Sequence, residues 1–317
     1  MTIKNVLLLG GSGFVGTAVA NHLANLDITV TVPSRRRERH KALIALPNVD
    51  MVEANIHDPV QLQQLMVGQD AVINLVGILH SSDLKLPYSR SFAEAHVELP
   101  KKIVAAAKAT GIKRLLHMSA LKASPDAPSE YLRSKADGEA VVKASGLDFT
   151  VFRPSVIFGV GDSFLTTFAK LLRLLPRFYV GYGHAKFQPV HVADVAEVIV
   201  RSLLDSSAVG QTYELVGPKV YTLRQIIEYV NELTGTHRKI KDLPEFWALV
   251  QAGFLSLMPK PLLSPDNLRS MEVDSVAADA QMPFGIVPAA MEAVAPTYLL
   301  GVAAKQKYDH FRLAAGR

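Results

Sequence analysis

A glycine-rich turn after the first apolar segment constrains the fold of this chain more than any other feature. Val6–Leu9 leads into Gly10-Gly11-Ser12-Gly13-Phe14-Val15-Gly16, and a helix-compatible stretch follows. We expect Gly10 to allow a sharp turn, Gly13 to admit a pyrophosphate to the backbone, and Gly16 to let helix and strand pack closely. Free N–H groups and the helix dipole would hold the phosphates. The alternative is a glycine-rich turn without a ligand. The predicted contacts are Gly10, Ser12, Gly13, Phe14, Val15 and Gly16.

Strand-like and helix-like segments alternate through the first half of the chain. The strand-like runs are 6–9, 28–32, 49–52, 71–76, 114–118 and 149–152. The helix-like segments between them are 14–25, 39–46, 59–66, 92–110 and 131–145. Short, nearly all-apolar strands separated by helices predict an α/β fold with a doubly wound parallel sheet, the Rossmann arrangement. Such sheets bind ligands at the carboxyl ends of their strands.

The alternation loosens after Arg153-Pro154. Helix-like segments at 164–175, 222–233, 244–257, 265–273 and 289–299 predict a smaller, mostly helical C-terminal lobe for a substrate or partner. We expect the dinucleotide-binding domain to comprise 1–153 and about 186–210, and the smaller lobe about 154–185 and 211–317. The apolar stretch Phe246–Met258 is interrupted by Gln251 and Gly253. It predicts a core helix in preference to an interfacial one.

Composition restricts the class of protein. The 317 residues are 49% hydrophobic and 20% charged, which is typical of a globular protein. The absence of cysteine excludes disulfides and thiolate chemistry, and the histidine spacing predicts no metal site. The net charge of +5 is spread out except at 35–41, so no nucleic-acid surface is expected. No apolar run reaches the ~18–20 residues that span a bilayer, and we expect a cytoplasmic protein.

The residues after the second predicted strand bear on the choice of cofactor. Folds that select NAD place an acid here to bond the adenosine 2′-hydroxyl. This chain has Pro33-Ser34-Arg35-Arg36 and no acid before Glu38. A hydroxyl and guanidinium groups suit a 2′-phosphate. We therefore expect NADP(H) in preference to NAD(H), with contacts from Ser34, Arg35 and Arg36. The alternative is a solvated basic start to the next helix.

Two further strand ends supply weaker candidates. Asn55-Ile56-His57-Asp58 follows the third strand, where an amide and a carboxylate could meet the adenine edge. Asn74-Leu75-Val76-Gly77 closes the fourth, where Gly77 would let the backbone pass the cofactor. Asparagine and aspartate are also common in such loops as turn formers. The candidate contacts from these segments are Asn55, Ile56, Val76 and Gly77.

Tyr131 and Lys135 lie four residues apart in a predicted helix, so the phenol and the ammonium would be neighbours on one face. An ammonium favours the phenolate, and moving the pKa ~3 units towards neutrality requires ~4 kcal/mol, which we expect from Lys135 together with an oxidised nicotinamide. Tyr131 could then exchange a proton with a carbonyl or alcohol oxygen while the cofactor moves a hydride. Ser119, at the end of the fifth strand, could hold the substrate oxygen. A second Y-x-x-x-K copy, Tyr182–Lys186, lies in a glycine-broken loop and is expected to be incidental.

Gly10–Gly16, Asn74–Gly77, Ser119 and Tyr131/Lys135, in this order, resemble the extended short-chain dehydrogenase/reductase superfamily over about the first 200 residues. The resemblance implies that Tyr131, Lys135 and Ser119 carry proton transfer and that Lys135 also bonds the nicotinamide ribose. It further implies that the segment Arg153–Gly159 passes the nicotinamide, with contacts from Pro154 and Val156.

Longer strings resemble one atypical branch of that superfamily, which includes the nucleotide-binding accessory subunit of mitochondrial respiratory complex I and its bacterial relatives. These strings are 131–142, 153–168, 187–194 and 261–276. The likeness implies tightly bound NADPH. Two hypotheses therefore compete: an NADP-dependent oxidoreductase or epimerase acting on a small carbonyl, alcohol or quinone-like molecule, and a nucleotide-binding subunit that contacts a membrane-associated respiratory complex. The second would place the protein at the periphery of the inner membrane.

Overall fold

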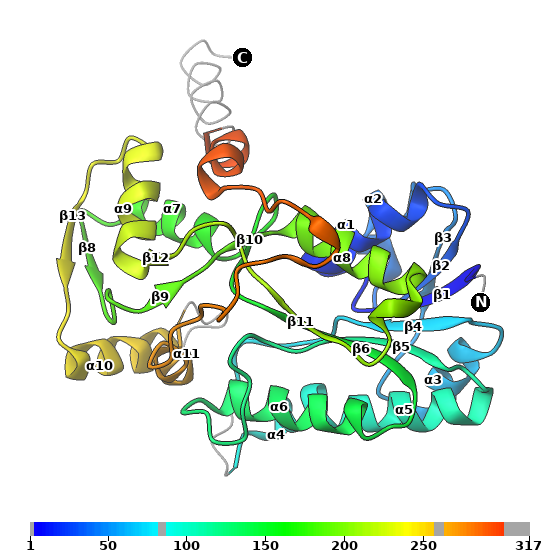
Figure 1. The fold of residues 1–317 in the computed structure, drawn as a ribbon. Helices are drawn as coiled ribbons and strands as arrows, with labels where there is room; N and C mark the ends of the chain where they lie inside the picture. Colours follow the sequence, from blue (N-terminus) through cyan, green and yellow to red (C-terminus); the bar gives the residue numbers. More distant parts are fainter. Residues whose placement is uncertain (1–2, 82–86, 257–262, 301–317) are drawn as a thin grey trace. The chain divides into compact units, whose positions relative to one another are not determined.

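A seven-stranded parallel sheet forms the centre of the first of two compact units (Figure 1). The computed structural model describes residues 3–81, 87–256 and 263–300. This first unit comprises Met1–Pro154, Val192–Leu215 and Gln281–Ile286. The strand order is β11-β6-β5-β4-β1-β2-β3. The strands are β1 (Asn5–Leu9), β2 (Thr29–Ser34), β3 (Val49–Glu53), β4 (Ala71–Asn74), β5 (Arg114–Met118), β6 (Asp148–Pro154) and β11 (Thr212–Leu215).

Helices cover both faces of this sheet. In Figure 1, α5 and α6 lie on one side of the strands, and α1 and α8 pack together on the other. The predicted doubly wound Rossmann fold is therefore confirmed. The helices are α1 (Phe14–Ala24), α2 (Lys41–Ile44), α3 (Pro59–Met66), α4 (Arg90–Ala93), α5 (Leu99–Thr110), α6 (Glu130–Lys143) and α8 (Val192–Leu204). Shorter turns are η1 (Arg37–Arg39), the π-helical η2 (Glu94–Glu98), η3 (Ser206–Ala208) and η4 (Pro283–Gly285).

The core of this unit explains why its strands are apolar throughout. All four side chains from Val6 to Leu9 on β1 are fully buried, because β1 lies in the middle of the sheet and is covered on both faces. Leu7 and Leu9 belong to one hydrophobic cluster with Leu62 of α3 and Ile103 of α5.

The structure corrects several predicted boundaries. The sheet has a seventh strand, β11, which pairs with β6, so the segment that returns to this unit is Val192–Leu215 and not about 186–210. Residues 186–191 belong to the other unit, and 281–286 belong to this one. The helix predicted at 39–46 is reduced to a 3₁₀ turn and the four residues of α2, and the helix predicted at 92–110 is interrupted by η2.

The second unit comprises Ser155–His191, Val216–Ala280 and Val287–Arg317 and is built from helices and short strand pairs. Its helices are α7 (Leu165–Leu174), α9 (Leu223–Leu233), α10 (Glu245–Ser256) and α11 (Pro265–Ser270), and residues 291–300 are also helical. The strand pairs are β7 (Ile157–Phe158) with β10 (Val190–His191), β9 (Lys186–Phe187) with β12 (Tyr221–Thr222), and β8 (Arg177–Val180) with β13 (Lys239–Asp242).

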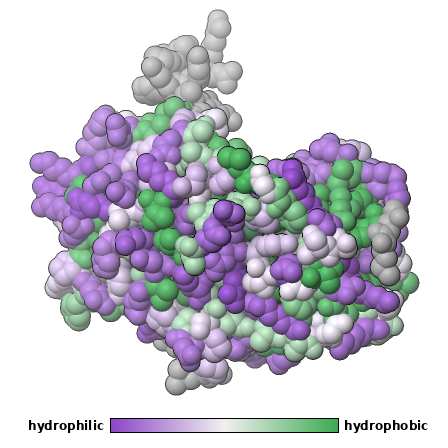
Figure 2. All heavy atoms as spheres, in the orientation of Figure 1, coloured by the Kyte–Doolittle hydropathy of each residue, from purple (hydrophilic) through white to green (hydrophobic). Residues whose placement is uncertain are grey.

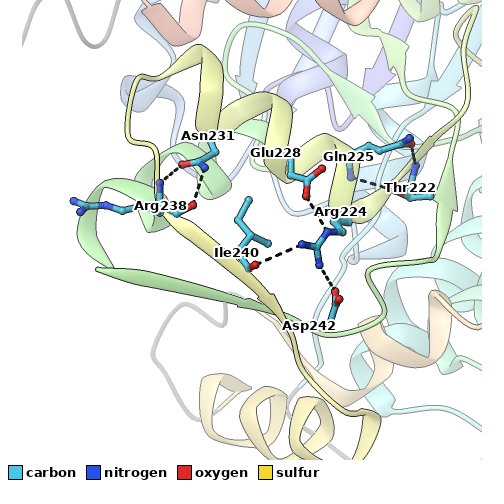
Figure 3. Close-up of polar contacts among 8 residues, drawn as sticks. All are labelled: Thr222, Arg224, Gln225, Glu228, Asn231, Arg238, Ile240 and Asp242. Atoms are coloured by element: carbon cyan, nitrogen blue, oxygen red, sulfur yellow. Dashed lines mark hydrogen bonds and ion pairs between the residues drawn. The ribbon is translucent and has the colours of Figure 1, made fainter.

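Polar side chains of α9 hold β13 in place (Figure 3). Arg224 donates to Asp242 at the end of β13 (2.7 Å) and to Glu228 one turn along the helix (2.8 Å). Asn231 bonds both backbone groups of Arg238, its oxygen accepting from the N–H (2.9 Å) and its amide donating to the carbonyl (3.0 Å). Thr222 and Gln225 form a capping box at the start of α9.

The apolar stretch predicted as a core helix forms α10, but the large side chains of its first half, Phe246 to Val250, are not buried. Ala248 and Ala252 face the core, whereas Phe246 is 67% exposed and Trp247 is 58% exposed. The ends of the strings 246–258 and 261–276 that fall within 257–262 lie outside the described residues. In the described part of the chain, every helix is too short or too polar to cross a bilayer.

Candidate dinucleotide site

The turn between β1 and α1 has a shape that side chains would block. Gly10 has a φ of +78°, and a Cβ there would lie 3.0 Å from the carbonyl carbon of Leu75. At Gly16 a Cβ would lie 2.2 Å from the carbonyl oxygen of Gly10, which is far inside contact distance. The sharp turn expected at Gly10 and the close packing expected at Gly16 are therefore confirmed. A Cβ at Gly13 would meet only the Gly10 oxygen, at 3.2 Å.

This turn leaves backbone donors free at the start of α1. Gly13 is the N-cap residue, without a side-chain cap, and the first turn carries no acidic residue. Its own N–H donates to Gly10 O (3.0 Å), and its carbonyl accepts from the N–H of Thr17 (2.9 Å). The N–H groups of Phe14 and Val15 have no partner inside the helix. Such donors at a helix N-terminus are the arrangement that binds a diphosphate.

The segment that follows β4 passes beside the glycine turn, and its Gly77 lies next to the side chain of Lys135. The Val76 N–H donates to the side-chain oxygen of Asn74 (3.2 Å). A Cβ on Gly77 would lie only 3.0 Å from Lys135 Nζ. The structure thus brings Gly10, Val76, Gly77 and Lys135 to one edge of the sheet, as the sequence predicts.

Lys135 is buried, with 5% of its surface exposed. Its ammonium donates one hydrogen bond, to the carbonyl of Met118 at the end of β5 (3.0 Å). Burial lowers the pKa of Lys135 to about 8. Among the described residues no carboxylate pairs with this ammonium, which has two further N–H donors. A cation held this way fits the hydroxyl groups of a ribose.

Tyr131 lies one turn before Lys135 on α6, with its ring edge-on to Phe92 (6.2 Å between centroids) and to His96 (5.6 Å). Burial raises the pKa of Tyr131 to about 12. Lys135 by itself does not lower this pKa, and its ammonium lies against Gly77 and Met118 O. At neutral pH Tyr131 is a protonated phenol.

His96, on the π-helical turn η2, connects these elements and was missed by sequence reasoning. Its Nε2 accepts from the Ile78 N–H (3.1 Å), which assigns the ring proton to Nδ1. Nδ1 donates to Ser134 Oγ (2.8 Å), and Ser134 Oγ donates to the Tyr131 carbonyl (2.8 Å). Burial lowers the pKa of His96 to about 2, so the ring is neutral. A histidine within an apolar helical pattern gave no signal of this role.

Ser119 follows β5, is 2% exposed, and lies near the carboxylate of Glu139 on α6. Among the described residues its hydroxyl has no partner at hydrogen-bond geometry. Glu139 accepts two hydrogen bonds from Arg153 (2.9 and 2.8 Å) and pairs with Lys143 (2.6 Å). Burial opposes ionisation of Glu139, but Arg153 and Lys143 hold its pKa below the usual value. Sequence reasoning also missed this buried ion pair.

The basic residues after β2 lie at the same edge of the sheet. β2 ends at Ser34, two residues later than predicted, and the Arg36 N–H donates to Ser34 Oγ (3.2 Å). The pKa of His57 is lowered by burial and by the positive charges of Lys102 and Arg35. Lys102, whose ammonium donates to His57 O (2.8 Å), is a further cation here that the sequence did not indicate.

Asn55 and Asp58 use their side chains locally. The Asn55 oxygen accepts from the His57 N–H (3.1 Å). Asp58 caps α3 by accepting from the N–H groups of Val60 (2.9 Å) and Gln61, and these two backbone hydrogen bonds lower the pKa of its carboxyl group. The carboxylate considered for adenine is therefore a helix cap. Ile56 packs, partly buried, against the core cluster of α3 and α5.

The remaining candidates lie further along the chain. Pro154 closes β6, and its carbonyl accepts from Leu121 N–H (2.9 Å). Val156 belongs to the second unit, where its carbonyl accepts from Val190 N–H (3.0 Å). In the second Y-x-x-x-K copy, Tyr182 donates to Glu245 (2.6 Å) and Lys186 lies 3.8 Å from Asp274, so each has another partner.

Comparison with known proteins identifies the family. The NAD dependent epimerase/dehydratase family matches residues 6–215. Subunit 9 of the NADH dehydrogenase [ubiquinone] 1 alpha subcomplex from Mus musculus is 33% identical over 276 residues, covering 85% of this chain and 72% of that protein. The (4-alkanoyl-5-oxo-2,5-dihydrofuran-3-yl)methyl phosphate reductase of Streptomyces griseus is 27% identical over 290 residues, covering 90% and 92%.

A solved structure, that of an NADPH-dependent quinone oxidoreductase from Escherichia coli complexed with NADPH, has a similar fold. Its TM-score is 0.74 at 18% identity, covering 93% of this chain and 99% of that one. The family match extends from β1 to β11 and so includes the whole parallel sheet, its glycine turn and the Tyr131–Lys135 helix. This chain therefore belongs to the NAD dependent epimerase/dehydratase family of extended short-chain dehydrogenases/reductases and binds a nicotinamide dinucleotide.

Proposed function

We propose that this protein is an NADP(H)-dependent oxidoreductase that acts on a small carbonyl, alcohol or quinone-like substrate. The observation that carries the proposal is Lys135, a buried ammonium held against Gly77 with donors to spare and no carboxylate partner among the described residues. Burying an unpaired charge is unfavourable. Binding the hydroxyl groups of the cofactor ribose would explain why the chain keeps a charge at this position.

Tyr131 supplies the proton in this proposal. When bound, a reduced nicotinamide would supply the hydride for the carbonyl carbon. Tyr131, with a pKa raised to about 12 by burial, holds its proton at neutral pH and can donate it to a carbonyl oxygen that becomes an alcohol. The resulting phenolate regains a proton from solvent. His96 and Ser134 position the backbone of α6 at Tyr131, and Ser119 is the candidate for holding the substrate oxygen.

Replacing the phenol hydroxyl tests this role. Tyr131→Phe is expected to abolish NADPH oxidation with a panel of carbonyls and quinones, and to leave NADPH affinity largely intact. Tyr213→Phe, on the edge strand β11, is the matched control and should turn over like the wild type. Unchanged turnover in Tyr131→Phe would remove Tyr131 from the mechanism.

The choice of NADP(H) rests on Ser34, Arg35 and Arg36. The two guanidinium groups are exposed at the end of β2, and Arg35 and Lys102 add positive charge around His57. Charge-assisted hydrogen bonds to a phosphate contribute ~1.5–3 kcal/mol each, so Ser34→Ala with Arg35→Asp should weaken NADPH by at least ~10- to 100-fold and NADH far less. Arg39→Asp, on η1, is the charge-matched control. Equal losses for the two nucleotides would contradict the 2′-phosphate assignment.

A second candidate function is that of a nucleotide-holding subunit of a membrane-associated respiratory complex. The 33% identity to a complex I subunit favours it, and so does the placement of Lys135, which serves cofactor binding whether or not Tyr131 reacts. This hypothesis expects a cytoplasmic protein at the periphery of the inner membrane. Native mass spectrometry should then find retained nucleotide and co-purifying chains, and no carbonyl or quinone should oxidise NADPH.

A further inference from the structure

An exposed basic and aromatic face lies on the two-stranded sheet of the second unit. In the parallel pair β8 and β13, Lys239 is in register with Arg177, and Lys241 with Tyr179. Because side chains alternate along a strand, these four side chains share one face of the pair. All four are exposed, whereas the residues between them on β8 are buried.

α10 presents large apolar side chains to solvent. Phe246, Leu249 and Val250 recur at helical spacing and, with Trp247, are between 36% and 67% exposed. Among the described side chains of α10, the buried ones are Ala248 and Ala252, and a Cβ at Gly181 would lie 2.4 Å from the Cβ of Ala248. This is the reverse of an ordinary surface helix, whose large apolar residues face the core.

The apolar side chains of α10 are continuous with the basic strand face. A hollow of about 280 Å³ is lined by Tyr179 of β8 and by Leu243, Trp247, Val250 and Gln251. Green hydrophobic side chains are visible among purple hydrophilic ones at the lower left of Figure 2, where α10 lies in Figure 1. We refer to Arg177, Tyr179, Lys239, Lys241, Phe246, Trp247, Leu249 and Val250 as the α10 face.

The cations of the α10 face have no anionic partner among the described residues. Asp242, the acid that follows Lys241 on β13, is bonded by Arg224 (Figure 3). Glu245, at the start of α10, accepts from Tyr182 (2.6 Å). The face therefore combines three unpaired positive charges with tryptophan, tyrosine and phenylalanine side chains. Tryptophan and tyrosine are the residues enriched at membrane–water interfaces, and basic residues are attracted to anionic lipid.

We propose that the α10 face binds the surface of an anionic lipid bilayer. Arg177, Lys239 and Lys241 would contact lipid phosphate groups. Phe246, Trp247, Leu249 and Val250 would enter the boundary between headgroups and acyl chains, where aromatic side chains are enriched. The site belongs to the second unit alone and does not depend on turnover or on the choice of cofactor.

Trp247 is the single tryptophan of the chain, so its fluorescence reports on this face directly. With the full-length protein, vesicles of phosphatidylcholine plus phosphatidylglycerol should shift the emission to shorter wavelength and allow quenching by brominated lipid. Vesicles of phosphatidylcholine alone should not, and added salt should reverse the shift. No change in emission with the anionic vesicles would overturn the proposal.

Charge variants complete the test by vesicle co-sedimentation. Lys239→Gln with Lys241→Gln should weaken binding about 30-fold, because each basic residue near an anionic surface contributes about 1 kcal/mol. Lys108→Gln with Lys113→Gln removes the same charge from exposed positions elsewhere and should leave binding unchanged. Equal weakening by the two pairs would mean that net charge, not this face, drives association, and would also overturn the proposal.

Discussion

Replacing Lys135 with methionine should stabilise the protein without cofactor and remove its stabilisation by NADPH. Burial lowers the pKa of Lys135 from 10.5 to about 8, so folding around the ammonium costs about 3 kcal/mol at neutral pH. Losing the hydrogen bond to Met118 O offsets about 1 kcal/mol of that gain. The free energy of unfolding of Lys135→Met should therefore exceed that of the wild type by about 2 kcal/mol at pH 7.

This difference has a defined dependence on pH. The folded-state pKa of Lys135 lies below its unfolded value, so the penalty is complete below about pH 8 and disappears as the pH rises towards 10.5. Urea denaturation at a series of pH values should show the free energies of unfolding of wild type and variant approaching each other over this range. A variant that is less stable at pH 7, with no convergence at alkaline pH, would refute the burial argument.

Adding NADPH tests whether Lys135 contributes to cofactor binding. A ligand at about one hundred times its Kd stabilises the folded state by about 2.7 kcal/mol. The wild type should gain this amount and Lys135→Met should gain little at the same concentration. Lys108→Met, at an exposed position of α5, is the control and should respond like the wild type. Full NADPH stabilisation of Lys135→Met would contradict the role of this ammonium at the cofactor.

Two other substitutions probe the same edge of the sheet. Gly77→Ala puts a Cβ 3.0 Å from Lys135 Nζ, so NADPH affinity measured by calorimetry should fall about tenfold. The free energy of unfolding should be nearly unchanged, because the lysine side chain can move away from the new methyl group. Gly253→Ala, whose Cβ meets nothing within 4 Å, is the control and should bind NADPH normally. Glu139→Gln removes the charge that pairs with Arg153 and Lys143 and should lower the free energy of unfolding by about 1.5–3 kcal/mol at neutral pH. Because the Glu139 pKa is held below 4.5, that loss should shrink as the pH falls below this value, and a pH-independent loss would count against the ion pair.

The parallel sheet was predictable because its central strands are buried on both faces and are therefore apolar without interruption. Val6–Leu9 on β1 illustrates this pattern. β11 escaped prediction because Thr212–Leu215 pairs on one side only and is mostly half-buried, so its composition is mixed. α10 was assigned to the core because apolar composition does not say which face of a helix is covered. Its alanines Ala248 and Ala252 are buried, and Phe246 and Trp247 face outwards.

In the candidate site, the sequence spacing of the residues predicted which helix face they share, but not how their polar groups are oriented. The interval from Tyr131 to Lys135 put both on one face of α6. It could not show that the ammonium turns to Met118 O, nor that burial raises the phenol pKa, because both depend on strands distant in sequence. His96 gave no signal for the same reason, because its hydrogen-bond partners Ile78 and Ser134 lie 18 or more residues away. Glu139 has Lys143 one turn along α6, but its pairing with Arg153 spans 14 residues and two elements.

Gly138 makes the closest contact between η2 and α6, since a Cβ there would lie 1.9 Å from the carbonyl oxygen of His96. The backbones of η2 and α6 are therefore in direct contact at Gly138, with no side chain between them. We therefore expect η2 and α6 to move as one unit when a nucleotide is released. Hydrogen exchange should find the amides of η2 and the middle of α6 opening in a single cooperative event.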